Sequence, residues 1–270
     1  MRKIRSILII GAFLFSLMQL NAQTYKRIVS LASSLTEHLK LLNAEHKLVG
    51  ITNYCVVESD INVVASAVDI NLERIVAVDP DLVLATSLTS TETLDLMKKI
   101  GLNVVFFKLP KSLNDINEQF IQIGELIGET DKAKAIVDNV NDRVKIARSK
   151  VQKSHIKVFM EIGTNPLFCV IPNTFLNDYI TFAGCENIAK DLTNGAISRE
   201  SVIISDPDVI FIVTMGTLGE EETRLWESYS HLSAVQKDQV FVINSEKACS
   251  PTPVNFIETL EEVIAKIYKK

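Results

Sequence analysis

ERIVAVDPDLVL, residues 73–84, returns later in the chain without a gap as ESVIISDPDVIF, residues 200–211. In each copy an acidic residue opens a short helical run, Asp-Pro ends it because proline cannot continue a helix, and an apolar strand follows. A single Asp-Pro-Asp before apolar residues is a common accident, but twelve aligned positions are not. The repeat therefore predicts two lobes of similar build, and two similar lobes imply a cleft between them.

A long uninterrupted helical pattern separates the two copies. Residues 129–154 contain neither glycine nor proline and form a charged amphipathic run, with Val140 and Val144 on its apolar side. We therefore predict one long helix over residues 129–154, between an N-terminal lobe over residues 23–128 and a C-terminal lobe over residues 155–270. Because this region has no flexible Gly/Ser linker, the helix joins the lobes stiffly.

Within each lobe, short apolar strands alternate with helices. Near-continuous apolar strands separated by helices indicate a parallel sheet that is covered on both faces. The strands that the pattern predicts are residues 27–31, 48–51, 81–85, 103–107, 156–162, 208–213 and 239–243. The expected fold class is α/β, with two Rossmann-like lobes built on central parallel sheets and joined by a single long α-helix.

The beginning of the chain has the layout of a secretory signal peptide. A basic start is followed by an apolar run over residues 7–20 and by small residues up to Ala22. The apolar run is shorter than the roughly 20 residues that a membrane-spanning helix needs. We expect residues 1–22 to be removed and, because no cysteine follows the run until Cys55, a mature periplasmic protein without a lipid anchor.

The charge balance disfavours a nucleic-acid partner. The chain has 28 Lys and Arg residues against 33 Asp and Glu residues, a formal charge of −5. Removal of residues 1–22 takes away three basic and no acidic residues, which changes the charge to −8. Nucleic-acid binding favours clustered Lys and Arg, so we expect a small-molecule ligand and no nucleic acid.

Motifs of catalysis and metal binding are missing from the sequence. It contains no GxSxG elbow, Walker loop, HExxH or GxGxxG motif, and its four histidines are scattered over different predicted elements. Its four cysteines form no CxxC pair, and in an exported protein they permit two disulfides without requiring them. We therefore expect a binding protein that is not an enzyme and has no resident cofactor or metal; a secreted hydrolase that uses the cleft is the alternative of a different class.

Two interpretations are open for the glutamates that begin the repeats, Glu73 and Glu200. A carboxylate in the first turn of a helix is favoured by the helix dipole by roughly 0.3 to 1 kcal/mol, so both can be ordinary helix-starting residues. One carboxylate on each lobe at matching positions can also form a two-point docking surface for a partner that bears two arginines.

Five segments carry a resemblance to a known family, and it extends over residues 25–268. They are RIVSLASSLTEHL from residue 27, VGITNY from residue 49, NLERIVAVDPDLVLA from residue 71, AGCENIAKDLTNGAISRE from residue 183 and SPTPV from residue 250. In this order and spacing they resemble the periplasmic binding proteins for cobalamin and ferric chelates. The resemblance implies a monomer with limited lobe closure that delivers its ligand to an inner-membrane ABC permease driven by an ATPase. It also implies that Glu73 and Glu200 dock on arginines of that permease.

Ligand contacts are expected in the loops after the strands. In a parallel sheet the ligand lies at the carboxyl ends of the strands, so these loops should line the cleft. The candidate ligand-binding residues are Ser33, Ser34, Tyr54, Thr86, Phe168, Glu246 and Ser250, and Ser87, Asn165 and Met215 lie in the same loops. By the resemblance, Tyr54 and Phe168 fall where the family has aromatic side chains that pack against a flat macrocycle.

The ligand that the resemblance implies is cobalamin or a related corrinoid. The sequence departs from a cobalamin-binding member at several of its aromatic and hydrogen-bonding positions, namely Ala67, Thr86, Asn194 and Ser250. A ferric siderophore or haem is therefore the alternative of the same class. Haem would favour Tyr54 or a histidine as axial ligand, whereas an anionic siderophore would favour a basic cleft. The predicted cleft loops hold few basic residues beyond Lys247, which disfavours an anionic chelate.

Overall fold

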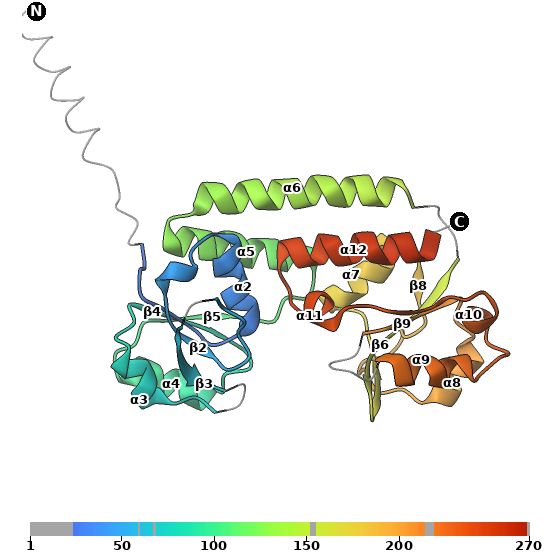
Figure 1. Ribbon diagram of the computed structural model, residues 1–270, viewed down its shortest axis with the longest axis horizontal. Coiled ribbons are helices and arrows are strands. Elements are labelled where there is room, and N and C mark those ends of the chain that lie inside the picture. The colour runs from blue at the N-terminus through green and yellow to red at the C-terminus, as the bar shows by residue number, and fades with distance from the viewer. Residues whose placement is uncertain (1–23, 59, 67–68, 152–154, 214–218, 269–270) are drawn as a thin grey trace, which may run out of the picture.

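Two α/β lobes lie side by side beneath one long helix, α6 (Thr130–Ser149), in the computed structural model (Figure 1). The structure describes residues 24–58, 60–66, 69–151, 155–213 and 219–268. The predicted signal peptide, Ala67 and Met215 lie outside these residues, as does the last part of the predicted helix, residues 152–154. The predicted fold class is confirmed.

The N-terminal lobe has five strands, all parallel, in the order β3-β2-β1-β4-β5. They are β1 (Ile28–Ser30), β2 (Leu48–Thr52), β3 (Asn62–Ala65), β4 (Leu82–Thr86) and β5 (Val104–Phe107). Successive residues of a strand point to opposite faces, so Ile28 packs with helices α2 (Ser33–Leu41) and α5 (Leu113–Ile127), and Val29 packs with α3 (Leu72–Ala77) and α4 (Thr91–Lys99). A short 3₁₀ helix, η1 (Glu45–Lys47), precedes β2.

The sheet of the C-terminal lobe is mixed, which corrects the expectation of a purely parallel sheet. Its path is β10-β9-β6-β7, with β8 paired to β6, and β7 runs antiparallel to β6 because only a short turn joins the two. The strands are β6 (Lys157–Thr164), β7 (Leu167–Cys169), β8 (Glu186–Asn187), β9 (Val209–Ile212) and β10 (Val240–Val242). The helices are α7 (Phe175–Phe182), α8 (Arg199–Ser205), α9 (Gly219–Glu227), α10 (Ser233–Gln236), α11 (Ser245–Ala248) and α12 (Pro253–Tyr268).

The two copies of the sequence repeat also make matching hydrogen bonds. Asp81 accepts a hydrogen bond from the backbone N–H of Arg27 at the start of β1 (3.0 Å), and Asp208 accepts one from the backbone N–H of Lys157 at the start of β6 (3.0 Å). The side chains of the same two basic residues donate to backbone carbonyls at the end of α3 and of α8. The aspartates that precede the prolines, Asp79 and Asp206, both have a φ of 44°.

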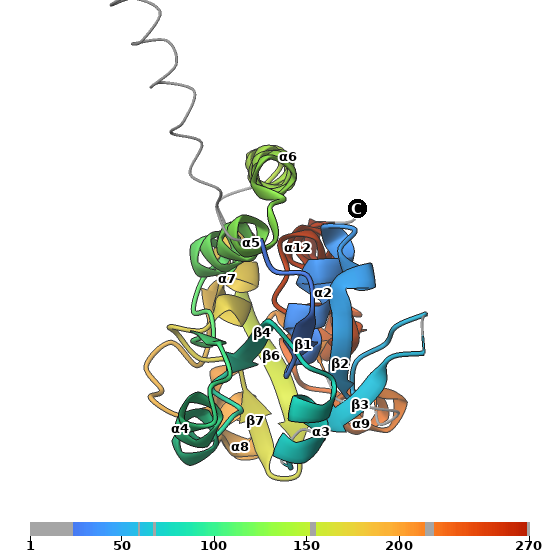
Figure 2. The ribbon, with the colours of Figure 1, turned by 90° about the vertical axis from the view of Figure 1, so that its left-hand side faces the viewer.

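Three helices form the base that connects the lobes (Figures 1 and 2). Helix α6 packs on both α5 and α12, and it contributes Val137 to the core of the N-terminal lobe and Val144 to the core of the C-terminal lobe. Arg143 of α6 forms an ion pair with Glu261 of α12 (2.7 Å). Because α12 and the start of α5 also pack in this base, the lobes are held by more than the one helix that the sequence predicted.

Candidate ligand-binding cleft

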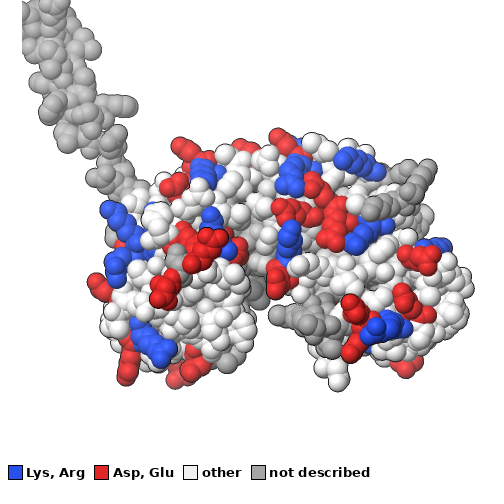
Figure 3. All heavy atoms as spheres, in the orientation of Figure 1, with Lys and Arg blue, Asp and Glu red and all other residues white. Residues whose placement is uncertain are grey.

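A cleft of about 900 Å³ lies between the lobes, and its walls come from both of them. Figure 3 shows the molecule notched between the lobes on the side opposite α6. The residues that line the cleft are Ser33, Glu37, Lys40, Tyr54, Val56, Gly219, Val242, Ile243, Asn244, Ser245, Glu246, Lys247, Ser250 and Asn255.

Helix α2 forms one wall of the cleft. Ser33, Glu37 and Lys40 line it at spacings of four and three residues, which places them on one side of the helix. The helix forms because Leu35 and Leu39, also four residues apart, are buried in the core of the N-terminal lobe. The burial of this apolar side presents the polar side of α2 to the cleft.

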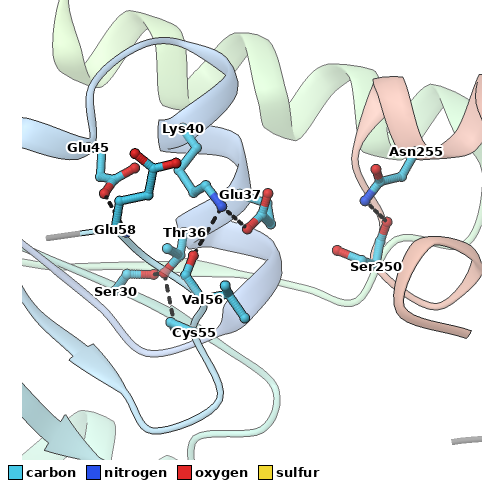
Figure 4. A network of polar contacts seen from close by, with 10 residues as sticks. All are labelled: Ser30, Thr36, Glu37, Lys40, Glu45, Cys55, Val56, Glu58, Ser250 and Asn255. Atoms are coloured by element: carbon cyan, nitrogen blue, oxygen red, sulfur yellow. Dashed lines mark hydrogen bonds and ion pairs between the residues drawn. The ribbon is translucent and has the colours of Figure 1, made fainter. Parts of the chain in front are cut away.

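The loop after β2 supplies the apolar part of this wall, with Tyr54 64% exposed and Val56 76% exposed. Two polar contacts attach the loop to α2, as Figure 4 shows: the hydroxyl of Thr36 lies 3.1 Å from the sulfur of Cys55, and Nζ of Lys40 donates to the carbonyl of Val56 (3.0 Å). The loop is therefore held against the helix while its tyrosine and valine side chains point to solvent.

The opposite wall begins where β10 ends. Asn244 caps the short helix α11 by accepting a hydrogen bond from the backbone N–H of Lys247 (3.1 Å), and this turn presents Glu246 to the cleft. Further along, Oγ of Ser250 has no hydrogen-bond partner among the described residues. Figure 4 places Ser250 and Asn255 across from α2. Ser250 and Asn255 thus belong to this wall, although Oγ of Ser250 itself is buried.

The charges in the cleft lining cancel, because two lysines and two glutamates contribute to it. Lys40 pairs with Glu37 at 2.8 Å, and Lys247 pairs with Glu258 at 2.6 Å. Both lysines therefore already have an acidic partner, so this lining is a poor match for a strongly anionic ligand.

His38 makes a hydrogen bond between the lobes close to the cleft. Its Nε2 lies 3.0 Å from the carbonyl oxygen of Pro251, and its ring meets Phe120 edge-on with 5.3 Å between the ring centres. Burial lowers the pKa of His38 to about 4, so the ring is neutral at pH 7. A neutral imidazole carries one N–H, which here donates from Nε2, and Nδ1 has no partner among the described residues.

Four of the seven candidate ligand-binding residues lie together in this lining: Ser33, Tyr54, Glu246 and Ser250. The other three are described but are not part of it. Ser34 is half-buried on α2, and Thr86 is buried, where its hydroxyl accepts from the backbone N–H of Leu88. Phe168 lies on β7, where its ring is close to Gly195.

The residues that the sequence interpretation missed are mostly on helix α2 and at the end of β10. Glu37 and Lys40 follow Ser33 at helical spacing, so the polar face of the predicted helix was the signal that could have identified them. Asn255 had no comparable signal, because its position depends on how α12 begins beside α11.

Glu73 and Glu200 lie in the first turns of α3 and α8, and both are exposed. Figures 1 and 2 show these two helices on the same side of the molecule, opposite α6. Within the described part of the chain neither glutamate forms an ion pair. The pKa of Glu200 is lowered because its own backbone N–H and the hydroxyl of Ser198 donate to the carboxylate.

A buried charge cluster lies beside Glu200. Arg199 forms an ion pair with the buried Glu222 of α9, and its guanidinium lies 4.7 Å from the ring centre of Trp226. Nε1 of Trp226 donates to Glu161 (2.7 Å), a fully buried carboxyl whose pKa is raised mainly by burial and further by the nearby Glu222. Arg199 therefore points into the lobe, away from the carboxylate that follows it.

All four cysteines are free thiols in the structure. Cys55 lies between the cleft residues Tyr54 and Val56, Cys249 is the C-cap of helix α11, and Cys169 is buried in β7. Within the described ranges, no group of three or more His, Cys, Asp and Glu side chains is arranged to hold a metal ion. The same ranges contain no helix that is both long and apolar enough to span a membrane.

The chain belongs to the periplasmic binding protein family, whose model matches residues 28–247. This confirms the resemblance found in the sequence. The uncharacterized ABC transporter substrate-binding lipoprotein YvrC of Bacillus subtilis is 26% identical over 90% of this chain and 80% of its own length. The vitamin B12-binding protein of Yersinia pestis is 29% identical over 75% of this chain and 74% of its own.

A solved structure agrees with this family. A possible iron-binding periplasmic solute-binding protein from Staphylococcus epidermidis superposes with a TM-score of 0.78 at 26% identity, over 91% of this chain and 100% of that one. Its similarity extends through both lobes and the helices between them.

Proposed function

We propose that this chain is the substrate-binding protein of an ABC importer, which takes cobalamin or a related corrinoid into the cleft between its lobes and delivers it to an inner-membrane permease. The observation that carries the proposal is the cleft of about 900 Å³ with walls from both lobes, in a chain related to a vitamin B12-binding protein. Small-molecule sites span roughly 300 to 1,000 Å³, so this cleft suits a large ligand. Its work is binding rather than bond making.

The chemistry of the walls supports a corrinoid over an anionic chelate. Tyr54 and Val56 offer apolar surface to a flat macrocycle, and Val242 lies on the facing wall. The paired lysines leave no free cation in the described lining for carboxylates of a ligand. The amide of Asn255 in the lining matches the amide side groups that a corrinoid carries around its ring.

Calorimetric titration of the purified exported protein with cyanocobalamin tests this proposal. We expect one-to-one binding, weakened about tenfold or more by Tyr54→Ala because a central aromatic contact is lost. Phe106→Ala is the matched control, because this 41% exposed ring on β5 is not part of the cleft lining. An absence of binding heat with cyanocobalamin, or an equal effect of the two variants, would refute the corrinoid assignment.

A haem or ferric chelate is the second candidate, and the exposed phenol of Tyr54 in the cleft favours it. A phenol can ligate iron, whereas packing against a corrinoid needs only the ring. Tyr54→Phe therefore separates the two ligands. Haem binding would lose its characteristic visible absorption in this variant, and corrinoid affinity would change little.

The partner in this proposal is the permease with its ATPase, which a monomer of this protein approaches from the periplasm. Glu73 and Glu200 dock on two cationic sites of the permease, one for each lobe. Their exposure and their lack of an ion pair with any described residue support this role. Capture of the permease by the purified protein measures this docking. The double variant Glu73→Ala, Glu200→Ala should capture less permease, while its affinity for the ligand stays the same.

A further inference from the structure

The helices that carry the two glutamates also expose large apolar side chains. Val76 on α3 is 51% exposed, and Ile204 on α8 is 84% exposed, the highest value for any large apolar side chain among the described residues. Scattered apolar residues are ordinary on protein surfaces, so exposure alone does not mark a site. Their position relative to the glutamates is the informative observation.

Each apolar side chain lies beside a glutamate. Val76 is three residues after Glu73, and Ile204 is four residues after Glu200, and both spacings place side chains on the same side of a helix. The two apolar residues are not at aligned positions of the sequence repeat, since Ala77 is the counterpart of Ile204. Each lobe thus pairs a carboxylate with an apolar side chain, but the apolar residue stands at a different position of the repeat in each lobe.

The packing of the lobes does not require these residues to be apolar. Helix α3 is anchored by Ile75 and helix α8 by Val202, and both anchors are fully buried. Val76 and Ile204 point away from these contacts to solvent. A polar residue at either position would leave the core of its lobe unchanged.

The arginine next to each glutamate is engaged elsewhere. The guanidinium of Arg74 donates to the carbonyl of Val63 (3.2 Å), and Arg199 pairs with Glu222 inside the C-terminal lobe. Each of the two surfaces therefore presents a carboxylate and an apolar side chain together. A partner that matches them carries a cation next to an apolar side chain, and carries this combination twice.

We propose that Val76 and Ile204 are the apolar half of the two-point surface by which this protein docks on its permease. The inference rests on the proposed function, because it takes the permease as the partner of Glu73 and Glu200. Helices α3 and α8 lie on the same side of the molecule, and the notch between the lobes opens on that side (Figures 1 and 3). A permease seated there contacts both lobes at once and faces the cleft.

The test compares two double variants and one single control variant of the full exported protein. An ABC permease–ATPase complex that the unaltered protein binds is placed in lipid nanodiscs. The dissociation constant between this complex and each variant is then measured. Val76→Ser with Ile204→Ser should weaken binding about tenfold or more, because two apolar contacts are lost, while calorimetry shows ligand affinity unchanged. Ile146→Ser is the matched control: this residue of α6 is 56% exposed and lies on the opposite side of the molecule.

The glutamate variants separate this inference from the proposed function. If the serine pair and the Glu73→Ala, Glu200→Ala pair both bind the permease more weakly, the result supports the further inference and the proposed docking glutamates alike. The binding that the alanine pair retains should then be insensitive to salt, because salt screens charge contacts but not apolar ones. Weakening by the alanine pair alone overturns the apolar contribution and keeps the docking glutamates. No weakening by either pair overturns the docking surface as a whole.

Discussion

At the scale of single residues, His38 shows how burial changes what a side chain can do. It lies on α2, and its ring contacts Phe120 of the same lobe and the backbone before α12 of the other lobe. An imidazolium there would lose its water and gain only one carbonyl partner, so the neutral ring is favoured. The contact between the lobes is therefore made by a neutral ring, whose single N–H on Nε2 donates to the carbonyl of Pro251.

His38 should make the protein less stable in acid. As the pH falls below 6.5, the histidine of the unfolded chain takes up a proton while the folded one stays neutral until about pH 4. The free energy of unfolding should therefore fall by roughly 2 to 3 kcal/mol between pH 6.5 and pH 4.5 from this residue. Urea unfolding at the two pH values measures this fall in the free energy of unfolding. In His38→Gln, which retains a donor for Pro251, the contribution of His38 to the fall should be absent.

His155→Gln is the control for this experiment, because His155 is exposed. It should retain the full loss of stability in acid. If His38→Gln and the unaltered protein lose the same free energy over this range, burial does not hold the His38 ring neutral.

At the scale of elements, the junction between α2 and the loop after β2 determines the shape of one cleft wall. Lys40 donates both to Glu37 of its own helix and to the carbonyl of Val56 in the loop. Cys55 meets the hydroxyl of Thr36 between them. Cys55 and Val57 of the loop also pack against the core, whereas Tyr54 and Val56 make little contact with it, so the Lys40 contact holds the exposed part of the loop.

Removal of the Lys40 contact should weaken ligand binding by letting the loop move. Lys40→Met should lower cyanocobalamin affinity by about two- to tenfold, the worth of one hydrogen bond of roughly 0.5 to 1.5 kcal/mol. Glu37→Gln should cost less, because the bond from Lys40 to the loop remains. Lys145→Met removes an exposed ion pair on α6 and serves as the control; an equal affinity of all three variants would argue against the anchor.

At the scale of the whole molecule, the two lobes are mounted on a base of α5, α6 and α12. The base is apolar within and carries an ion pair between α6 and α12, so the lobes have little freedom to rotate apart. We therefore expect the cleft to be largely formed before a ligand arrives. Helices α3 and α8 are also kept at a set separation, which the proposed two-point contact with a permease requires.

At this scale we also predict that the exported protein carries no lipid. The apolar run of the predicted signal peptide is followed by no cysteine until Cys55, although the relative from Bacillus subtilis is a lipoprotein. The mass of the protein purified from the periplasm should match a chain that begins near residue 23, without a lipid. A larger mass that corresponds to an attached acyl chain, or recovery only with the membrane fraction, would contradict this prediction.

The sequence alone determined the two-lobe α/β fold. Local chemistry encodes it: Asp-Pro ends a helix at Pro80 and again at Pro207, apolar runs form buried strands, and residues 130–149 contain nothing that interrupts a helix. It did not predict β3 or the antiparallel β7, because short strands are specified by their partners more than by their own residues.

The tertiary structure alone decided which residues face the cleft. Thr86 is the last residue of β4 and Tyr54 lies just after β2, so both are near a strand end, but the hydroxyl of Thr86 is used within its own turn and its side chain is buried. Lys40 reaches the cleft because α2 buries the leucines on its other side, and Ser250 does so because α12 begins beside α11. Sequence patterns record which side of an element is apolar, whereas a binding site depends on how several elements are placed, and that is settled by packing across the whole chain.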